Sequence, residues 1–421
     1  MVAPFTETLI NNYGGGIEIA SDKTTIIGNT IKHNTGDGIR LIGSNNTLRN
    51  NKISNNTSNF SLKWEIGWED STFVNDVDSS NLVDCKPVIY WVNKQDRKVP
   101  ENAAFVALVN CSNILIENLD LSNVGQGVVA VSSANLNITR ISIQATAQGI
   151  TIYRSSGILI NNVTINGGST GICLVYSSKN TMIDNMLIYG GSGIHLISSS
   201  ENTVRNNVIT KRVGRGILLD YSYDNLICWN IISGGSFAGI SLDGSKYNVI
   251  CGNLIADCRE LALTFWNNAS ENLFYLNNFI NNTRNTAEYL LGMPAFPINF
   301  WYNNTLGNFW SDYTARYPNA KEVDGSGIWD IPYVINEHNK DCYPLTRPVV
   351  IPKFANELPT TTSLFSSPDN ASTKESCPVC GMFALMVTVV MVISLIFYFA
   401  VLRKIIAKLK VQTRGRRNEH F

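Results

Sequence analysis

Asp220 and Asp243 are the residues of this chain best placed to do chemistry together. Each lies four residues after a glycine, at the same place in consecutive units of a sequence repeat. If the units stack as parallel strands, the two carboxylates lie about one strand spacing apart, roughly 4.8 Å. Retaining glycosidases use carboxyl pairs separated by about 5–5.5 Å. The pattern therefore predicts a candidate catalytic pair for a polysaccharide hydrolase or lyase.

Two further polar residues fall on neighbouring columns of the same predicted face. His195 would serve with the aspartates as a third catalytic residue, and Tyr153 would contact a bound ligand. In the simpler interpretation, both aspartates are solvated residues beside a turn and are flanked by neutral, serine-rich sequence. The sequence leaves both interpretations open.

The elements that must position these residues follow from a repeat. A glycine followed by Ile or Val recurs at a nearly constant interval, at Gly127, Gly149, Gly171, Gly193, Gly216 and Gly239. After each glycine, apolar side chains alternate with variable ones, which is the period of a strand. One such unit cannot bury its own apolar face, so the units must stack into a solenoid. The sequence predicts an all-β fold, a parallel β-helix.

An asparagine column supports this stacking. It comprises Asn51, Asn185, Asn207, Asn230 and Asn253, each just before the last apolar segment of its unit. Amides stacked in register can hydrogen-bond from one unit to the next, as in other cross-β stacks. We expect the column to be a structural ladder at a corner of the solenoid.

The repeat is interrupted between residues 59 and 110, where aromatic residues increase. Val88 to Val92 and Arg97 to Val99 resemble the two arms of a hairpin. Trp64, Trp68 and Trp91 are candidate ligand-binding residues, because aromatic rings stack on the apolar faces of sugars. Alternatively, these tryptophans seal the insertion onto the coils.

Residues 291–347 are rich in aromatic residues and proline, and we expect them to cap the open end of the solenoid. Within them, Asp324 and Asp330 flank a glycine-containing run that is typical of a Ca²⁺ loop but lacks full EF-hand spacing. An ordinary glycine turn is the alternative. Calcium is the one cofactor that the sequence suggests.

Cysteine spacing suggests two disulfides. Cys228 and Cys251 occupy the same outward position on adjacent units, and Cys85 and Cys111 flank the interruption. Cys377 and Cys380 form a CxxC pair, for which the sequence leaves a local disulfide, a lipidated thiol and a weak zinc signal open.

The C-terminal sequence predicts a membrane anchor. Residues 382–402 form an uncharged apolar run that is long enough for one transmembrane helix. The basic tail 403–421 follows directly, which places it in the cytoplasm and the solenoid outside the cell. Residues 348–381, rich in Pro, Ser and Thr, would form a stalk. No export signal precedes the first repeat, which suggests a truncated start.

The repeat units resemble those of the NosD-like, carbohydrate-binding and sugar-hydrolase (CASH) family of right-handed parallel β-helix proteins, which is abundant among archaeal surface proteins. Val83-Asp84-Cys85-Lys86-Pro87-Val88 is similar to the interruption in that family, and Gly307-Asn308-Phe309-Trp310 with Asp330-Ile331-Pro332-Tyr333 is similar to its C-terminal signature. The resemblance implies a right-handed coil over residues 1 to about 347. It also implies copper handling in some members and sugar binding or cleavage in others.

Copper handling would need soft or imidazole ligands. The four histidines, His33, His195, His338 and His420, are scattered, and no two His or Met residues share an outward column on neighbouring units. This speaks against a periplasmic copper-handling role.

The predicted organisation is coils at 1–58 and 111–290, an insertion at 59–110, a cap at 291–347, and then the stalk, anchor and tail. The 33 basic and 33 acidic residues balance, so no nucleic-acid partner is expected. We expect a membrane-anchored, non-catalytic surface protein whose polar face binds glycans or other surface proteins. The alternatives are a polysaccharide hydrolase or lyase and a copper-handling protein.

Overall fold

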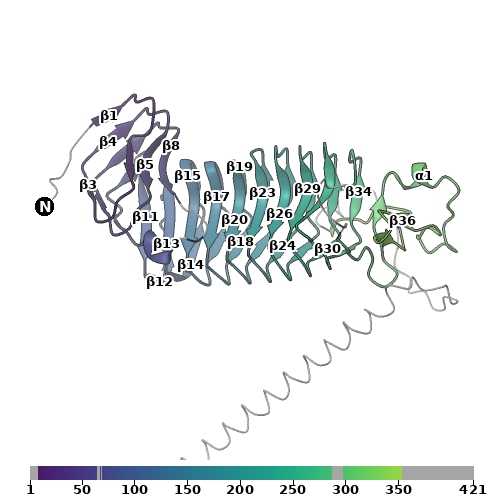
Figure 1. Cartoon of the computed structure of the whole chain (residues 1–421). Coiled ribbons are helices and arrows are strands. Elements are labelled where there is room, and N and C mark those ends of the chain that lie inside the picture. The colour runs from purple at the N-terminus through teal and green to yellow at the C-terminus, as the bar shows by residue number, and fades with distance from the viewer. Residues whose placement is uncertain (1–7, 64–66, 68, 287–296, 353–421) are drawn as a thin grey trace, which may run out of the picture. The chain divides into compact units, whose positions relative to one another are not determined.

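The computed structural model describes residues 8–63, 67, 69–286 and 297–352. These residues form an all-β solenoid in which short parallel strands from successive coils pair along the whole length (Figure 1). The coils form two stacks, joined where the chain reverses direction between β10 and β11.

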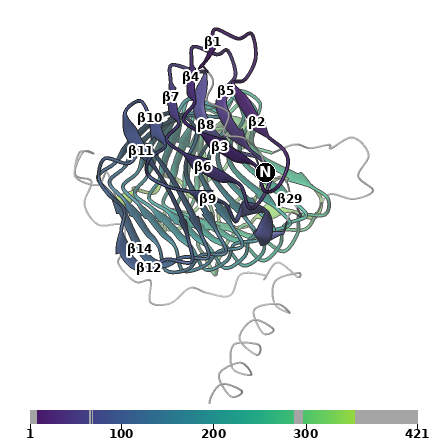
Figure 2. The same cartoon turned by 90° about the vertical axis from the view of Figure 1, so that its left-hand side faces the viewer.

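The first stack has three parallel ladders of short strands. They are β1 (Thr8–Ile10), β4 (Thr30–Lys32), β7 (Lys52–Ser54) and β10 (Leu82–Val83); β2 (Ile17–Ile19), β5 (Asp37–Leu41) and β8 (Ser58–Leu62); and β3 (Thr25–Ile27), β6 (Thr47–Arg49) and β9 (Asp76–Val77). The 3-10 helix η1 (Asp70–Phe73) lies between β8 and β9 in the chain. Figure 2 looks onto this stack and shows β1, β4, β7, β10 and β11 side by side.

The second stack also has three ladders, which we name A, B and C. Ladder A consists of β11 (Lys86–Val92), β13 (Phe105–Val109), β15 (Asp120–Val131), β17 (Ser142–Tyr153), β20 (Thr170–Val175), β23 (Ser192–Ile197), β26 (Arg215–Asp220), β29 (Ala238–Asp243) and β32 (Leu261–Trp266).

Ladder B consists of β12 (Gln95–Lys98), β14 (Ser112–Glu117), β16 (Asn137–Thr139), β18 (Leu159–Asn161), β21 (Thr181–Ile183), β24 (Thr203–Arg205), β27 (Leu226–Cys228), β30 (Val249–Cys251) and β33 (Leu273–Tyr275). Ladder C begins with the first halves of β15 and β17 and continues with β19 (Thr164–Gly167), β22 (Met186–Ile188), β25 (Val208–Thr210), β28 (Ile231–Ser233), β31 (Leu254–Ala256), β34 (Asn278–Ile280) and β35 (Phe309–Trp310). Because β15 and β17 are long enough to run through both, ladders A and C join into one sheet.

The predicted alternation sets the core. The residue after each repeat glycine and the residue two further on point inward and are fully buried, as Ile194 and Leu196 are in β23. The glycines themselves allow close packing at the corner. A Cβ added at Gly216 would lie 2.3 Å from Cγ2 of Ile232 and 2.5 Å from the carbonyl oxygen of Gly239. The uniform columns of the sequence are therefore the interior of the solenoid.

The predicted asparagine ladder is confirmed. The Nδ2 group of Asn207 donates to Oδ1 of Asn230 at 2.9 Å, and Nδ2 of Asn230 donates to Oδ1 of Asn253 at 2.9 Å. The sequence prediction missed a second ladder, through Asn180, Asn202, Asn225, Asn248 and Asn272. It also missed a serine ladder, through Ser133, Ser155, Ser177, Ser199, Ser222 and Ser245.

The predicted hairpin between Val88–Val92 and Arg97–Val99 is wrong. β11 pairs in parallel with β13, and β12 pairs in parallel with β14, so the two arms are successive strands of one coil. The antiparallel pair of this region is β10 with β11, joined by Asp84 (φ 47°) and Cys85 (φ 65°). Two central residues with positive φ fit a two-residue hairpin turn, which matches the twist of the strands it connects.

The first stack rests on the outer face of the first strands of ladder A. Phe60 of β8 lies 4.9 Å, centroid to centroid, from Phe105 of β13. The amide side chain of Gln126 pairs with the backbone of Leu62, accepting at 3.1 Å and donating at 2.7 Å. Strand β13, the middle of β11 and the second halves of β15 and β17 therefore have both faces buried. This burial explains why the recurring glycine with its following Ile or Val is not seen between residues 59 and 110, although coils are present there.

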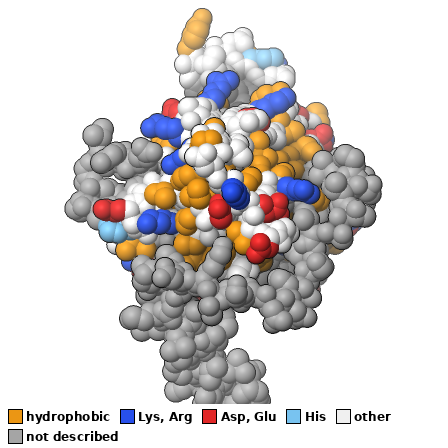
Figure 3. Space-filling model, turned by 90° about the vertical axis from the view of Figure 1, so that its right-hand side faces the viewer, with side chains coloured by type: hydrophobic (Ala, Val, Ile, Leu, Met, Phe, Trp, Pro, Cys, Tyr) orange, Lys and Arg blue, Asp and Glu red, His pale blue; other side chains and the backbone are white. Residues whose placement is uncertain are grey.

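The predicted aromatic cap is confirmed. The inward column that ends at Phe279 is continued by Trp310 at 4.3 Å and then Tyr333 at 4.1 Å, with nearly parallel rings. The cap includes α1 (Tyr313–Arg316), β36 (Tyr333–Val334) and β37 (Lys340–Asp341). Viewed from this end, hydrophobic and charged side chains are interspersed over the surface (Figure 3).

No helix within the described ranges is long and apolar enough to cross a membrane. The predicted transmembrane run 382–402, the tail 403–421 and residues 353–381 of the stalk lie outside the described residues.

Candidate functional site

The structure brings His195 and the two aspartates together on the outer face of ladder A. Asp220 of β26 is in register with Asp243 of β29. Nε2 of His195 lies 2.7 Å from Oδ2 of Asp220. Because a carboxylate only accepts hydrogen bonds, Nε2 carries the proton in this pair. The side chains of His195 and Asp220 are 18% and 28% exposed, so the pair is partly shielded but reachable from solvent.

The two aspartates do not bond to each other. Asp220 turns toward His195, on the preceding strand. Asp243 turns the other way, and its Oδ1 accepts from Nδ2 of Asn267 at 2.6 Å. Each carboxylate is thus held by a neighbour on the opposite side.

Aromatic side chains flank the aspartates, and sequence reasoning missed them. Trp266 of β32 is in register with Asp243 and extends the column Asp220–Asp243 by one strand. Its Nε1 is buried and has no hydrogen-bond partner among the described residues. Tyr221, 52% exposed, follows Asp220 directly, and its ring lies against Gly244. Trp266 could have been predicted from its position in the repeat, because it lies five residues after Leu261 in the next unit and so falls in register with Asp243.

The neighbouring column on the same face contains polar residues, but most of them are buried from solvent. His195 lies in one column with Cys173 on one side and with Leu218, Ser241 and Thr264 on the other. Oγ1 of Thr264 donates to Oγ of Ser241 at 2.7 Å, and both residues are fully buried. Burial, with a smaller contribution from the charge of Asp220, raises the pKa of the Cys173 thiol to about 12. This thiol is protonated and is not a nucleophile at neutral pH.

The predicted ligand-binding aromatics lie elsewhere. Tyr153 is buried, and its ring centroid lies 5.8 Å from that of Phe73 in η1 and 6.0 Å from that of Tyr176. It is therefore packed under the first stack and is not on an open surface. Trp91 is half-buried against the core of the second stack, as in the sealing interpretation. Trp64 and Trp68 lie outside the described residues.

The predicted calcium run forms a hairpin. The backbones of Glu322 and Trp329 form an antiparallel β-bridge. Asp324 (φ 46°) and Gly325 (φ 71°) form the turn between them. Oδ1 of Asp330 accepts from the backbone N–H of Lys321 at 2.8 Å. No group of three or more His, Cys, Asp or Glu side chains with metal-binding geometry occurs within the described part of the chain. Calcium at Asp324 and Asp330 stays a prediction without a further carboxylate in support.

Of the predicted disulfides, the one between Cys85 and Cys111 is ruled out by position. Cys85 precedes β11 and Cys111 follows β13, so they lie at opposite ends of two paired strands, beyond the reach of a disulfide. Cys228 and Cys251 are in register on β27 and β30, both as free thiols. A hydrogen bond from the Cys228 thiol lowers the pKa of Cys251, and the same bond raises that of Cys228.

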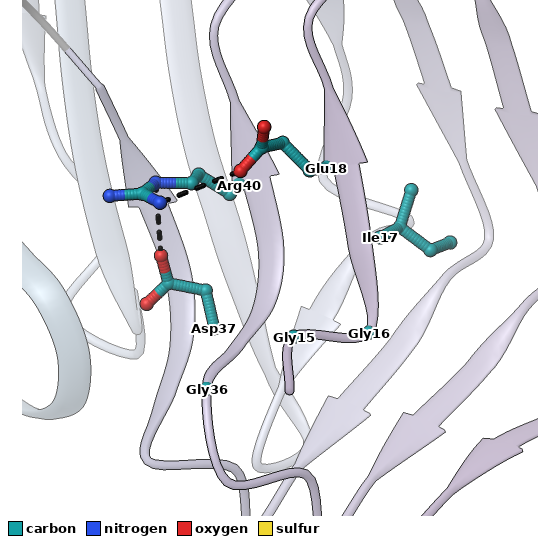
Figure 4. A pocket seen from close by; sticks show the side chains of 7 residues that line it. All are labelled: Gly15, Gly16, Ile17, Glu18, Gly36, Asp37 and Arg40. Atoms are coloured by element: carbon teal, nitrogen blue, oxygen red, sulfur yellow. Dashed lines mark hydrogen bonds and ion pairs between the residues drawn. The ribbon is translucent and has the colours of Figure 1, made fainter. Parts of the chain in front are cut away.

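A hollow of about 400 Å³ lies in the first stack, lined by Gly15, Gly16, Ile17, Glu18, Gly36, Asp37 and Arg40 (Figure 4). Arg40 is 3.5 Å from Glu18 and 3.4 Å from Asp37, so the charges of the hollow are already paired. It lies on β2 and β5, apart from the face with His195.

The fold and this face define the class: a parallel β-helix protein with a polar and aromatic outer face. Residues 106–315 match the family described as periplasmic copper-binding protein (NosD), and residues 6–185 match the right-handed beta helix region. The chain belongs to the NosD and right-handed β-helix family.

Solved structures add distant similarity. The periplasmic alginate epimerase AlgG is 14% identical, with a TM-score of 0.42 over 67% of this chain and 76% of that one. A variant tailspike protein of E. coli bacteriophage HK620, in complex with a hexasaccharide, is 12% identical, with a TM-score of 0.40 over 70% of this chain and 54% of that one. No curated protein matches the chain.

The family description raises the question of copper. His33 is exposed, His338 lies beside Glu337, His195 is bonded to Asp220, and His420 lies outside the described residues. No pair of imidazoles forms among the described histidines. The thiols of Cys228 and Cys251 are the side chains that fit a soft metal ion.

Proposed function

We propose that this protein is an extracytoplasmic β-helix protein that binds glycans on the outer face of ladder A. The observation that carries the proposal is the column of Asp220, Asp243 and Trp266, in register on three consecutive strands. Carboxylates accept hydrogen bonds from sugar hydroxyls, and an indole presents an apolar face to the C–H groups of a sugar ring. The column offers both kinds of contact at one strand spacing, about 4.8 Å.

The directions of the two carboxylates favour binding over cleavage. A retaining glycosidase needs its carboxyl groups to face one bond from about 5–5.5 Å. Here Asp220 is held toward His195, and Asp243 is held toward Asn267. Each carboxylate has one oxygen left for a ligand, but the two carboxylates point in opposite directions along the ladder. The arrangement suits two adjacent sugar-binding positions.

One observation favours a second candidate, glycan cleavage. The 2.7 Å contact of Asp220 with Nε2 of His195 fixes the orientation of the imidazole. A histidine held in this way can serve as a general acid or base. A hydrolase or lyase at His195, Asp220 and Asp243 is therefore the alternative.

Glycan binding by the full chain, in detergent, tests the proposal. A glycan array finds the ligand, and calorimetry then measures its affinity for Asp243→Asn and Trp266→Ala. We expect each change to weaken binding at least tenfold. Asp96→Asn, on exposed β12 of ladder B, is the matched control and should bind normally. Equal affinity of all four proteins would refute the site.

Cleavage is assayed with the same glycans. Product formation that disappears in His195→Gln and Asp220→Asn would make the protein an enzyme. Binding without products supports the non-catalytic role. If no glycan binds, a surface protein becomes the partner to seek by cross-linking on cells.

The proposal includes a membrane anchor at residues 382–402, supported by the apolar run and the basic residues that follow it. An extracytoplasmic solenoid agrees with the periplasmic description of the matching family. In cells, the full chain should fractionate with membranes, and a variant ending at residue 381 should not. Protease added to intact cells should reach the solenoid but not the tail.

A further inference from the structure

Three cationic residues lie at the corner where the chain passes from ladder C to ladder A. Lys211 and Arg212 directly follow β25, and Arg215 is the first residue of β26. Other cations of the protein, such as Lys98 and Arg140, pair with carboxylates, whereas none of these three forms an ion pair with another described residue. We name Lys211, Arg212 and Arg215 the basic corner. Its charges are open to a ligand.

Arg212 is the buried member of the basic corner. Its side chain is only 2% exposed. Burial lowers the pKa of the guanidinium from 12.5 to about 10, so the group still carries its charge at neutral pH. A buried ion without a counter-charge is strongly unfavourable, which is why buried charges in proteins are normally paired. The fold therefore holds an uncompensated positive charge at this corner.

The free hydrogen-bond donors of Arg212 lie on one edge of its guanidinium. Nη1 donates to the backbone carbonyl oxygen of Gly167 at 3.3 Å. Nε and Nη2 are buried and have no hydrogen-bond partner among the described residues. The N–H bonds of these two atoms point the same way, and together they form the planar fork that holds both oxygens of a carboxylate. The unpaired edge is thus shaped for one kind of anion.

Glycines of the preceding coils make room for this guanidinium. A Cβ added at Gly190 would lie 2.6 Å from Nη1 of Arg212, and one added at Gly171 would lie 3.1 Å from Nη2. Gly190 adopts a φ of 97° and is partly exposed, so bare backbone covers the guanidinium there. A side chain at either glycine would occupy the place that the guanidinium needs.

The two neighbours of Arg212 add positive charge that is nearer to solvent. The Nε of Arg215 is also buried and unpaired, while its guanidinium carbon lies 4.4 Å from the ring centroid of Phe237. The exposed Lys211 donates from Nζ to the hydroxyl of Tyr189 at 3.3 Å. Neither contact neutralises a charge. An anion on Arg212 would therefore be attracted by two more cations.

We propose that the basic corner binds one carboxylate group, held by Nε and Nη2 of Arg212. A carboxylate supplies two planar oxygens to the fork and one negative charge to the buried cation. Ordered water would satisfy the two donors but would leave the charge uncompensated. A free small acid and an acidic sugar both carry this group. The site is separate from the column of Asp220, Asp243 and Trp266, so it does not depend on the proposed function.

The test is equilibrium dialysis of the full chain, in detergent, against radiolabelled acetate at constant ionic strength. We expect saturable binding of one acetate per chain. Arg212→Lys keeps the charge but removes the fork, and Arg212→Met removes both, so each should weaken acetate binding at least tenfold. Arg259→Gln is the matched control and should bind normally, because Arg259 is an exposed arginine between β31 and β32, at the same corner of a later coil.

A further variant keeps the test independent of folding. Arg215 is only partly buried, so Arg215→Gln leaves the buried guanidinium in place, and it should weaken acetate binding severalfold. The proposal is overturned if the wild type binds no acetate, or if both Arg212 variants bind it as tightly as the control.

Competition identifies the source of the carboxylate. Trigalacturonate is added to the acetate-loaded wild type, with neutral galactotriose as its control. Displacement of acetate by trigalacturonate alone supports the site and makes an acidic glycan its ligand. Retention of acetate in the presence of both sugars supports the site and makes a free small acid its ligand. Equal displacement by both sugars would overturn a carboxylate-specific site.

Discussion

The carboxylate of Asp341 ends the main asparagine ladder, and its removal is the perturbation we develop first. Its Oδ2 accepts from the backbone N–H of Asn308 at 2.7 Å, from Nδ2 of Asn308 at 3.3 Å and from Nε1 of Trp310 at 2.9 Å. Its Oδ1 accepts from the backbone N–H of Tyr343 at 3.1 Å. Every amide in the ladder donates toward the C-terminus, so the last step needs a group that accepts.

The magnitude follows from burial. Burial raises the pKa of Asp341 from 3.8 to about 7, although the N–H donors partly offset the rise. A rise of this size corresponds to about 4 kcal/mol of unfolding free energy. Because the folded state binds the proton more tightly, this contribution is fully present below pH 3.8 and is lost as pH rises to about 7.

The assay compares the wild type with Asp341→Asn, which keeps an acceptor oxygen for the ladder but cannot ionise. Urea unfolding is followed by tryptophan fluorescence, which reports on Trp301 and Trp310 in the cap. Between pH 4 and pH 7.5, the wild type should lose about 4 kcal/mol relative to the variant. Other carboxylates cancel in this difference. A difference that does not vary with pH would refute the reasoning.

Two further changes test the ladder and the cap. Asn230→Ala unpairs buried groups of Asn207, Asn253 and Val204 and should cost about 3 kcal/mol or more in urea unfolding. The exposed Asn102→Ala, at a residue without positive φ, should cost little. A loss below about 1 kcal/mol would contradict the ladder's role. Trp310→Ala removes two ring stacks and a hydrogen bond and should cost about 3–5 kcal/mol in thermal unfolding. An unchanged melting temperature would show that the cap does not stabilise the last coils.

The coil architecture could be predicted because the repeat makes each residue's neighbours known. Leu196 and Leu219 hold the same place in consecutive units, and their shared period fixes both as interior and adjacent. The same logic placed Asp220 beside Asp243 and Cys228 beside Cys251, as the strand pairing confirms. Register is readable from sequence wherever one face of a strand is buried, because a shift of one residue would turn every side chain over.

The reversal between the stacks could not be read in this way. Strand β11 follows a turn at Asp84 and Cys85, and the hydroxyl of Tyr90 on its outer face donates to the backbone carbonyl of Phe73 in the first stack. A strand that is buried on both faces has no polar alternation, so periodicity gives no orientation for it. Tyr153 was predicted to face solvent for this reason and is buried instead.

By itself, the sequence determined the coil, its register and the ladder columns, because these depend on spacing along one chain. The tertiary structure decided which outward residues are free. It turned Asp220 toward His195 and Asp243 toward Asn267, and it covered Tyr153. Side-chain direction and cover depend on contacts between distant segments, and these contacts have no period in the sequence.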